Sequence, residues 1–464
     1  MINIEALQST FRGRLIQPDN YDYDEVRQVW NGYIDKHPAL IAQCSGTADV
    51  IDAVKFARKN DIEVSVRGGG HNVAGSALCD DGMVIDLSQM RGIHVDPSQK
   101  LARVQGGATW GDLDRETQIF GLAAPGGVVF TTGVAGLTLG GGLGWLRKKH
   151  GLSCDNLHSI EMVTADGKLL TASQTENQDL FWALRGGGGN FGIVTSFVFH
   201  LHNVGPTVMM CAIMYPIEIA ENVLSTWRDF MISSPDEISS QALFWAVPDI
   251  DAFPEEARGK HVIVISAMYA GDPDEGEKAF QELREIDTPV LDLSGKIPYT
   301  TANSMFDPFF PKHERYYYFK SQDLASLNKE TRSALIEGAK NRPVPSMLLA
   351  IWHYGREMNR IASKDTAFGS RDTTFLLSVD SIWDDPADSE KVISWSRAFL
   401  DKMKRFSRDG MYVNFSGFGE EGDDLVQKAY GDNYNRLAKI KGKYDPDNFF
   451  HLNQNIKPLS SLLK

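Results

Sequence analysis

The sequence predicts an α+β fold built from more than one domain, and three observations support this prediction. The chain has 464 residues, which at roughly 150 residues per domain suggests about three domains. Strand-like apolar runs alternate with amphipathic helical stretches along its length. Glycine is unevenly spread, because 25 of the 42 glycines lie in the 125 residues from Gly68 to Gly192. These features divide the chain into three regions, at about residues 1–205, 206–405 and 406–464.

The first region, residues 1–205, combines glycine clusters with short strands. A helix is expected over residues 23–32, and strands are expected over 39–43, 62–70, 83–88, 101–107, 159–173 and 191–201. A helix over residues 48–60 separates the first two strands, so this part reads as a β-α-β unit. Within residues 159–173, an Asp-Gly pair between two apolar runs predicts a hairpin turn.

The second region, residues 206–405, has the pattern of an α+β layer. Its strand-like runs are VMMCAIMY, HVIVISAMYAG, RYYYFK, PSMLLAIWHYG and TTFLLSVDSIW, and PDEGEKAFQELREI is helical. This alternation predicts a sheet with helices packed on one face. The third region is expected to contain a strand over residues 411–417, a helix over 423–444 and a loop over 445–456.

Composition and charge exclude several classes of protein. Hydrophobic residues make up 42% and aromatic residues 10% of the chain, which is typical of a globular protein. The net charge of −14 argues against nucleic acid or an anionic membrane as a partner. There is no 18-residue apolar run, no signal-peptide pattern and no CxxC pair, so we expect a cytoplasmic protein. No metal site is expected, and the sequence does not indicate an oligomeric state.

Three glycine clusters raise the question of what lies against them. They are SVRGGGHNVAGS (65–76), TTGVAGLTLGGGLGWL (131–146) and FWALRGGGGNFGIVTSF (181–197). Successive glycines after a strand allow backbone N–H groups to converge on an anion, although a tight turn explains the first cluster equally well. Neither a dinucleotide fingerprint nor a P-loop is present. His71 directly follows the three glycines of the first cluster, where an imidazole can attack or anchor an electrophilic ligand.

Five motifs together resemble one family of flavoproteins. They are RGGGHNVAG, GLTLGGGLGWL, HGLSCDNL, DLFWALRGGGGNFGIVTSF and YDPDNFFHLNQNI. In this order they resemble the berberine bridge enzyme-like branch of the vanillyl-alcohol oxidase/p-cresol methylhydroxylase superfamily. The resemblance implies a bipartite, PCMH-type FAD-binding domain of two α+β subdomains, formed by residues 1–205 and the returning segment 406–464. Residues 206–405 would then form the substrate domain, an antiparallel sheet covered by helices.

The same resemblance implies the chemistry. A hydride would pass from an alcohol, sugar or amine carbon of a small-molecule substrate to FAD, and O₂ would reoxidise the flavin to give H₂O₂. Two alternatives stay open: a flavin dehydrogenase that uses another acceptor, and a flavin-binding protein without turnover. The aromatic content of the second region favours a bulky or planar substrate, although sugars also stack on aromatic side chains.

His71 occupies the place of the family's histidine that is joined covalently to the flavin 8α-methyl group. A second link, from a cysteine to flavin C6, is not expected. The position four residues before Gly133 is Val129, and Cys154 lies downstream of it. In this respect the sequence is similar to the mono-covalent 6-hydroxy-D-nicotine oxidase type. The resemblance implies cofactor contacts at Arg67, Gly68, Gly69, Gly70, His71, Asn72, Gly75, Ser76, Thr131, Thr132, Gly133, Gly136, Gly141, Gly142, Leu143, Gly144, Asp155, Asn156, Gly192, Ile193, Val194, Asn453 and Asn455.

The base that removes the substrate proton is left open by the sequence. The position that aligns with the family's catalytic tyrosine is Phe415, which cannot accept a proton. In a strand, Tyr412 and Asn414 would share one face beside it. The family's alternative base, a carboxylate in the middle domain, falls at Arg360, with Glu357 and His353 nearby. The catalytic candidates are therefore Tyr412, Asn414, Glu357 and His353.

Overall fold

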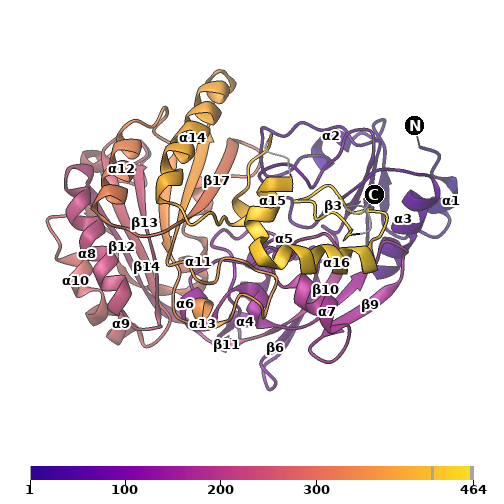
Figure 1. The fold of residues 1–464 in the computed structure, drawn as a ribbon, viewed down its shortest axis with the longest axis horizontal. Helices are drawn as coiled ribbons and strands as arrows, with labels where there is room; N and C mark the ends of the chain where they lie inside the picture. The colour runs from indigo at the N-terminus through magenta and orange to yellow at the C-terminus, as the bar shows by residue number, and fades with distance from the viewer. Residues whose placement is uncertain (1, 420–422, 460–464) are drawn as a thin grey trace.

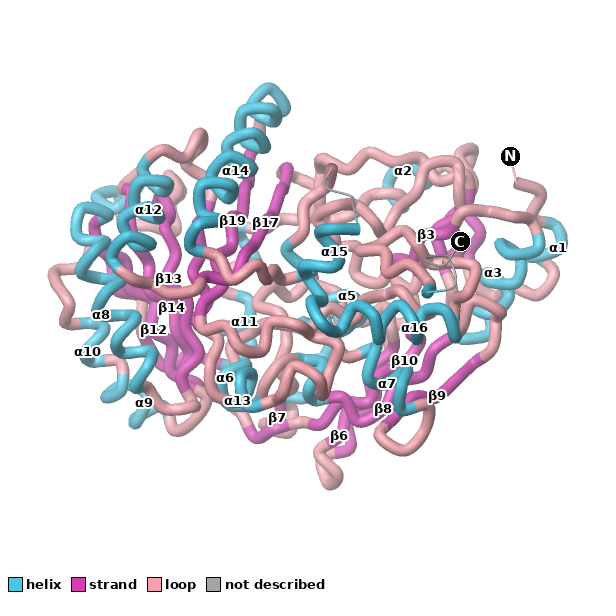
Figure 2. The backbone as a smooth tube through the Cα atoms, in the orientation of Figure 1, coloured by secondary structure: helices cyan, strands magenta, loops and turns pink. Residues whose placement is uncertain are grey.

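The computed structural model describes residues 2–419 and 423–459, which form two lobes packed against each other (Figures 1 and 2). One lobe contains the first region and the end of the chain, and the other contains the second region. Several sheets and surrounding helices make up both lobes, so the predicted α+β class is confirmed.

The first lobe begins with a small sheet in the order β1-β2-β4-β3, in which β2, β4 and β3 are parallel. Its elements are β1 (Arg14–Ile16), β2 (Leu40–Gln43), β3 (Val64–Arg67) and β4 (Met83–Asp86), with α1 (Glu5–Gln8), α2 (Tyr23–Val26) and α3 (Thr47–Lys59). The β-α-β unit of β2, α3 and β3 is present, and β4 lies between its two strands. Val50, Val54 and Ala57 of α3 are buried beside this sheet, as the helical pattern predicts.

The helix expected over residues 23–32 is limited to its first turn, α2. Beyond it, the backbone pairs with distant segments: the Trp30 N–H donates to the Gly70 carbonyl at 3.1 Å, and the Gly32 N–H donates to the Arg315 carbonyl at 3.0 Å. These bonds replace the i to i−4 hydrogen bonds that would continue the helix. They also connect this segment to both lobes.

A second sheet completes the first lobe, in the antiparallel order β5-β6-β10-β8-β9. Its strands are β5 (Ile93–Asp96), β6 (Leu101–Gln105), β8 (Leu157–Val163), β9 (Leu169–Ser173) and β10 (Ile193–His200), and β7 (Leu122–Ala123) pairs separately with β11 (His202–Asn203). The helices are α4 (Trp110–Gln118), α5 (Val134–Leu139), α6 (Arg147–His150) and α7 (Gln178–Leu184). The predicted hairpin joins β8 to β9, with Gly167 at φ +73° in its turn.

The second lobe is built on one antiparallel sheet in the order β15-β12-β14-β13-β18-β19-β17, with β16 beside β12. Its strands are β12 (Thr207–Pro216), β13 (Ile238–Ala246), β14 (His261–Tyr269), β15 (Leu291–Asp292), β16 (Gly295–Pro298), β17 (Tyr316–Leu324), β18 (Leu348–His353) and β19 (Phe375–Trp383). Its helices are α8 (Ala220–Ser233), α9 (Pro273–Ala279), α10 (Gln281–Arg284), α11 (Tyr299–Ser304), α12 (Lys329–Lys340), α13 (Glu357–Arg360) and α14 (Ser389–Met403). Helices α8, α12 and α14 cover the outer face (Figure 1), and the other face looks toward the first lobe.

The C-terminal segment returns to the first lobe, but two of its predicted elements differ. Residues 411–417 do not form a strand and instead contain a 3₁₀ turn at Val413–Phe415. The Ser321 hydroxyl stabilises this turn, because it accepts the N–H of Tyr412 and donates to the carbonyl of Tyr412. The helix expected over 423–444 is divided into α15 (Asp423–Tyr430) and α16 (Tyr434–Tyr444). Gly431, at φ +49°, separates them because a left-handed residue cannot continue a right-handed helix.

Buried cations of α6 join the two lobes. The guanidinium of Arg147 donates to the carbonyls of Gly144, Ser240 and His353, and the ammonium of Lys148 donates to the carbonyl of Ser234 at 3.0 Å. Both side chains are fully buried, so their partners in the second lobe replace water. Among the described residues, no helix is long and apolar enough to span a membrane.

Candidate active site

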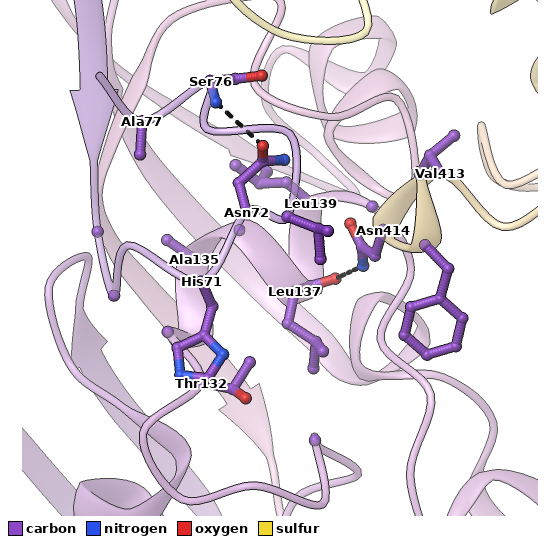
Figure 3. Close-up of a pocket in the computed structure, with 18 of the residues that line it drawn as sticks. His71, Asn72, Ser76, Ala77, Thr132, Ala135, Leu137, Leu139, Val413 and Asn414 are labelled. Atoms are coloured by element: carbon purple, nitrogen blue, oxygen red, sulfur yellow. Dashed lines mark hydrogen bonds between the residues drawn. The ribbon is translucent and has the colours of Figure 1, made fainter. Parts of the chain in front are cut away.

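A cavity lies between the glycine-rich loops of the first lobe and the inner face of the large sheet. It brings together many of the residues that the sequence associates with a cofactor: Gly68, Gly69, Gly70, His71, Asn72, Ser76, Thr132, Gly133, Gly136, Leu143, Gly192, Ile193, Val194 and Asn453. Figure 3 shows this wall, where the Asn72 side chain accepts the N–H of Ser76 and so holds the loop that follows His71. Three glycine clusters from distant parts of the chain therefore face one space.

Two glycines let these loops meet backbone to backbone. A Cβ on Gly69 would stand 2.4 Å from the Gly133 nitrogen, and a Cβ on Gly133 would stand 2.5 Å from the Gly69 nitrogen. Any side chain at either position would push the loops apart. At Gly136 and Gly189, by contrast, a Cβ would meet no heavy atom within 4 Å. Both line the cavity, so bare backbone borders open space there.

His71 stands at the end of the first glycine turn with one ring nitrogen engaged. Its Nε2 is 2.7 Å from the Thr131 hydroxyl, and its ring stacks on Trp30 with centroids 4.7 Å apart. Desolvation, assisted by the charge of Lys312, lowers the pKa of His71 to about 3. The imidazole is therefore neutral at physiological pH and retains a lone pair on one nitrogen.

The remaining predicted cofactor residues do not line the cavity; they support its loops. They are Arg67, Gly75, Thr131, Gly141, Gly142, Gly144, Asp155, Asn156 and Asn455. Arg67 forms a buried ion pair with Asp86 at 2.7 Å, and Asp155 forms one with Arg371 at 2.6 Å. The Asn156 amide donates to two backbone carbonyls of the preceding turn. Cys154 is buried as a free thiol, and burial raises its pKa well above the usual value.

Of the four catalytic candidates, only Asn414 lines the cavity. Its amide nitrogen donates to the Leu137 carbonyl at 3.0 Å (Figure 3) and to the Tyr412 hydroxyl at 2.8 Å. An uncharged amide of this kind is not a general base. Asn414 therefore positions the turn rather than accepting a substrate proton.

The other three candidates lie away from the cavity wall, which argues against their role as base. The Tyr412 hydroxyl is buried and also accepts the N–H groups of Gly142 and Leu143, and burial raises its pKa to about 12. His353 is buried at the end of β18, where desolvation lowers its pKa well below the usual value. Glu357 is partly exposed on α13 and pairs with Arg360 at 3.2 Å.

Asp380 is the carboxylate that the sequence reasoning missed. It lies on β19, opposite Phe319 of β17 and Leu348 of β18, and it lines the cavity. The Ser378 hydroxyl donates to it. Burial raises its pKa to about 7 against the opposing effect of that hydrogen bond. In TTFLLSVDSIW the polar Ser378 and Asp380 alternate with the apolar Leu377 and Val379, which indicates a polar strand face but not what that face lines.

Part of the cavity wall is apolar and aromatic. It is formed by Trp30, Leu243, Phe306, Phe310, Phe319, Leu348, Trp352 and Phe415. Gln241 is the polar side chain of the large sheet that joins Asp380 there. Among the described residues, His71 and Asp380 are the only titratable side chains that line the cavity. A carboxylate whose pKa is about 7 and a neutral imidazole thus line the same, mostly apolar cavity.

Two parts of the chain match known families: residues 38–173 match one described as FAD binding domain, and residues 411–457 match one described as berberine and berberine like. The chain is 31% identical to (R)-6-hydroxynicotine oxidase of Paenarthrobacter nicotinovorans, over 98% of this chain and 99% of that protein. It is also 31% identical to the FAD-linked oxidoreductase YgaK of Bacillus subtilis, over 96% and 97%. The crystal structure of 6-hydroxy-D-nicotine oxidase from Arthrobacter nicotinovorans shares its fold, with a TM-score of 0.86 and 28% identity over 96% and 98% of the chains.

Proposed function

The chain belongs to the berberine bridge enzyme-like family of FAD-linked oxidoreductases, and we propose that it oxidises a bulky, apolar alcohol or amine. In this proposal His71 holds the FAD covalently, Asp380 accepts the substrate proton, and O₂ takes the electrons to give H₂O₂. One observation carries the proposal: the glycine turn that ends at His71 and a single buried carboxylate, Asp380, line the same cavity.

The cavity residues fit FAD on two grounds. Bare backbone at Gly136 and Gly189 borders open space, which leaves room for a large flat ligand. The buried Oδ1 of Asn453 has no hydrogen-bond partner among the described residues, and an amide oxygen there can accept a ring N–H. When bound, FAD supplies the two-electron acceptor. Backbone N–H groups of residues 68–72 would hold its pyrophosphate, with residues 192–194 at the adenine and Asn453 at the ring edge.

The covalent link would use the nitrogen of His71 that is not engaged by Thr131. Because Nε2 is bonded to the Thr131 hydroxyl, Nδ1 is left for the bond to the 8α carbon. Forming that C–N bond removes one C–H and one N–H bond, which releases two protons and two electrons. With FAD bound, O₂ would take up these two electrons, so attachment would need no other oxidant.

Asp380 would take the proton from the substrate O–H or N–H as the hydride leaves the adjacent carbon. A carboxylate oxygen of Asp380 would receive the proton and bound FAD would supply the acceptor for the two C–H bond electrons, so that the substrate would gain a C=O or C=N bond. Its raised pKa, near 7, makes the carboxylate a stronger base than an exposed aspartate while it remains largely ionised above neutrality. The Ser378 hydroxyl holds one oxygen and so orients the other.

The apolar wall favours a planar or bulky substrate with few hydroxyl groups. An oligosaccharide would bury many hydroxyls here, and Gln241 and Asp380 are the polar side chains that the large sheet offers them. A screen coupled to H₂O₂ detection, over aromatic alcohols, cyclic amines and oligosaccharides, tests this choice. Turnover of an oligosaccharide at the highest rate in the panel would refute the substrate class. Slow reoxidation in air after anaerobic reduction would refute the oxidase assignment in favour of a dehydrogenase.

The covalent link has a separate test. Acid precipitation of the wild-type protein should leave a yellow pellet, and precipitation of His71→Ala should leave a colourless one. A flavin that stays with the His71→Ala protein after denaturation would contradict attachment at His71.

A further inference from the structure

We propose that Trp30 and Thr131 form a holder for His71, which fixes the plane and the hydrogen-bonding state of its imidazole so that flavin can be attached. The inference rests on the covalent link of the proposed function. It assigns Trp30 and Thr131 as positioning residues, since neither is required to bond to the flavin or the substrate.

Trp30 supplies one side of the holder. Its indole stacks on the His71 ring with centroids 4.7 Å apart and planes 18° apart. It also stacks on Tyr317, with centroids 3.7 Å apart and planes 19° apart. The indole N–H donates to the Phe310 carbonyl at 3.0 Å. Stacked and hydrogen-bonded in this way, Trp30 cannot tilt, so the plane of the His71 ring is defined by a rigid neighbour.

The main chain around Trp30 is fixed by Asn31, whose side chain is fully buried. Its amide nitrogen donates to the carbonyls of Val73 and Tyr317, both at 2.8 Å, and its oxygen accepts the Tyr317 N–H at 3.0 Å. Val73 belongs to the loop that carries His71, and Tyr317 belongs to β17 of the other lobe. The holder is therefore complete only when both lobes are docked, which makes flavin attachment a late step of folding.

Thr131 supplies the other side of the holder. Its hydroxyl lies 2.7 Å from Nε2 of His71, and no hydrogen bond to Nδ1 is formed by the residues that the structure describes. A nitrogen that forms a new bond to carbon needs a free lone pair. When Nε2 carries the proton and donates it to Thr131, that lone pair is on Nδ1. Because a hydroxyl can donate or accept, Thr131 engages Nε2 in either tautomer, and Nδ1 is the ring nitrogen left without a partner among the described residues.

The test compares substitutions that keep or remove each contact. Thr131→Val removes the hydroxyl from an exposed side chain at nearly constant shape, and Thr131→Ser keeps the hydroxyl. Trp30→Leu removes the stacking ring, and Trp30→Phe keeps a ring. Purified proteins are incubated with added FAD, and covalent flavin is followed by fluorescence in denaturing gels beside total bound flavin by absorbance.

We expect Thr131→Val to slow covalent attachment about tenfold, which corresponds to about 1.4 kcal/mol, the size of one net hydrogen bond. Thr131→Ser should attach flavin at the wild-type rate. Trp30→Leu should lower the covalent fraction of the bound flavin, with Trp30→Phe in between. A merely structural role would lower covalent and non-covalent flavin together and leave their ratio unchanged.

Two results would overturn the inference and are distinguishable. If the wild type binds flavin only non-covalently, the link of the proposed function fails and the holder fails with it. If the wild type is covalently loaded and Thr131→Val matches it in rate and extent, the holder alone is refuted. Should Trp30→Leu fail to fold, the exposed Thr131 pair still decides the question.

Discussion

Replacing Asp380 with asparagine should remove turnover and, at the same time, stabilise the fold at alkaline pH. A general base contributes roughly 10²–10⁴-fold to turnover, so a loss of that size is expected. The stabilisation follows from burial, because an isolated carboxylate held away from water is costly to ionise. Few substitutions of purely structural residues both abolish turnover and stabilise the fold, so this combination is diagnostic of a residue that is kept for function.

The size of the stability effect follows from the pKa of Asp380. The pKa is about 7 in the folded protein and about 3.9 in the unfolded chain. Because the pKa is higher in the folded protein than in the unfolded chain, ionisation of Asp380 destabilises the fold. The free energy of unfolding therefore falls as the pH rises from about 4 to about 7. By linkage, the cost is about 1.5 kcal/mol at pH 5 and about 4 kcal/mol at pH 8. The advantage of Asp380→Asn over the wild type should therefore grow by about 2.5 kcal/mol between these pH values.

Denaturant unfolding of the holoenzyme at both pH values, together with turnover of the best substrate from the panel, tests this reasoning. Asp114→Asn is the matched control: Asp114 is also buried and has a pKa of about 7, but it bonds Asn303 and does not line the cavity. It should show the pH-dependent stabilisation with normal turnover. Turnover of Asp380→Asn within about threefold of the wild type would refute the role of Asp380 as the base. An equal stability difference at both pH values would refute its raised pKa.

Three further predictions concern the proposed base, the flavin-binding cavity and the contact between the two lobes. The turnover of the wild type should rise with pH through about 7, as Asp380 ionises, and a pH–rate profile measures it. Gly136→Val should lower the amount of bound flavin at least about tenfold, because the new side chain would enter the cavity. The ratio of flavin to protein absorbance measures this loss. Gly295→Val is the control and should leave the ratio unchanged, because Gly295 also borders open space but does not line the cavity. Arg147→Met should lower the free energy of unfolding by roughly 3 kcal/mol, because three carbonyls lose their donor, whereas the exposed Arg405→Met should change it little in the same denaturant titration.

The sequence predicted the fold where local pattern and tertiary structure agree. Five strands of the large sheet (β12, β14, β17, β18 and β19) and the hairpin around Gly167 are encoded by nearby residues, whereas β13, β15 and β16 were not predicted. The two segments whose predicted secondary structure was wrong share another cause. The segment around Trp30 and the turn at Val413–Phe415 take their conformation from partners hundreds or tens of residues away, such as Gly70, Arg315 and Ser321. No periodicity within a short window can report such bonds.

The glycine-rich side of the cavity was easier to predict from the sequence than the side formed by the large sheet, for a physical reason. A glycine cluster signals that backbone approaches something closely, so the sequence alone associates Gly69 and Gly136 with a ligand. A base is one ordinary aspartate, and its meaning depends on strand register. Asp380 becomes visible only when β19 is placed between β17 and β18.

The two faces of β19 show how one strand serves both stability and chemistry. Phe375, Leu377 and Val379 point into the core beneath the outer helices, where any charge would be penalised. Ser378 and Asp380 lie on the opposite face, where Asp380 lines the cavity and Ser378 donates to it. Among the described residues, the other titratable side chain that lines the cavity is the neutral His71. Because no cation among the residues that the structure describes lines the cavity to offset its charge, the carboxylate is held at an energetic cost that packing alone does not explain. A bound substrate with a proton to give would relieve that cost, which is the physical basis for assigning the base to Asp380.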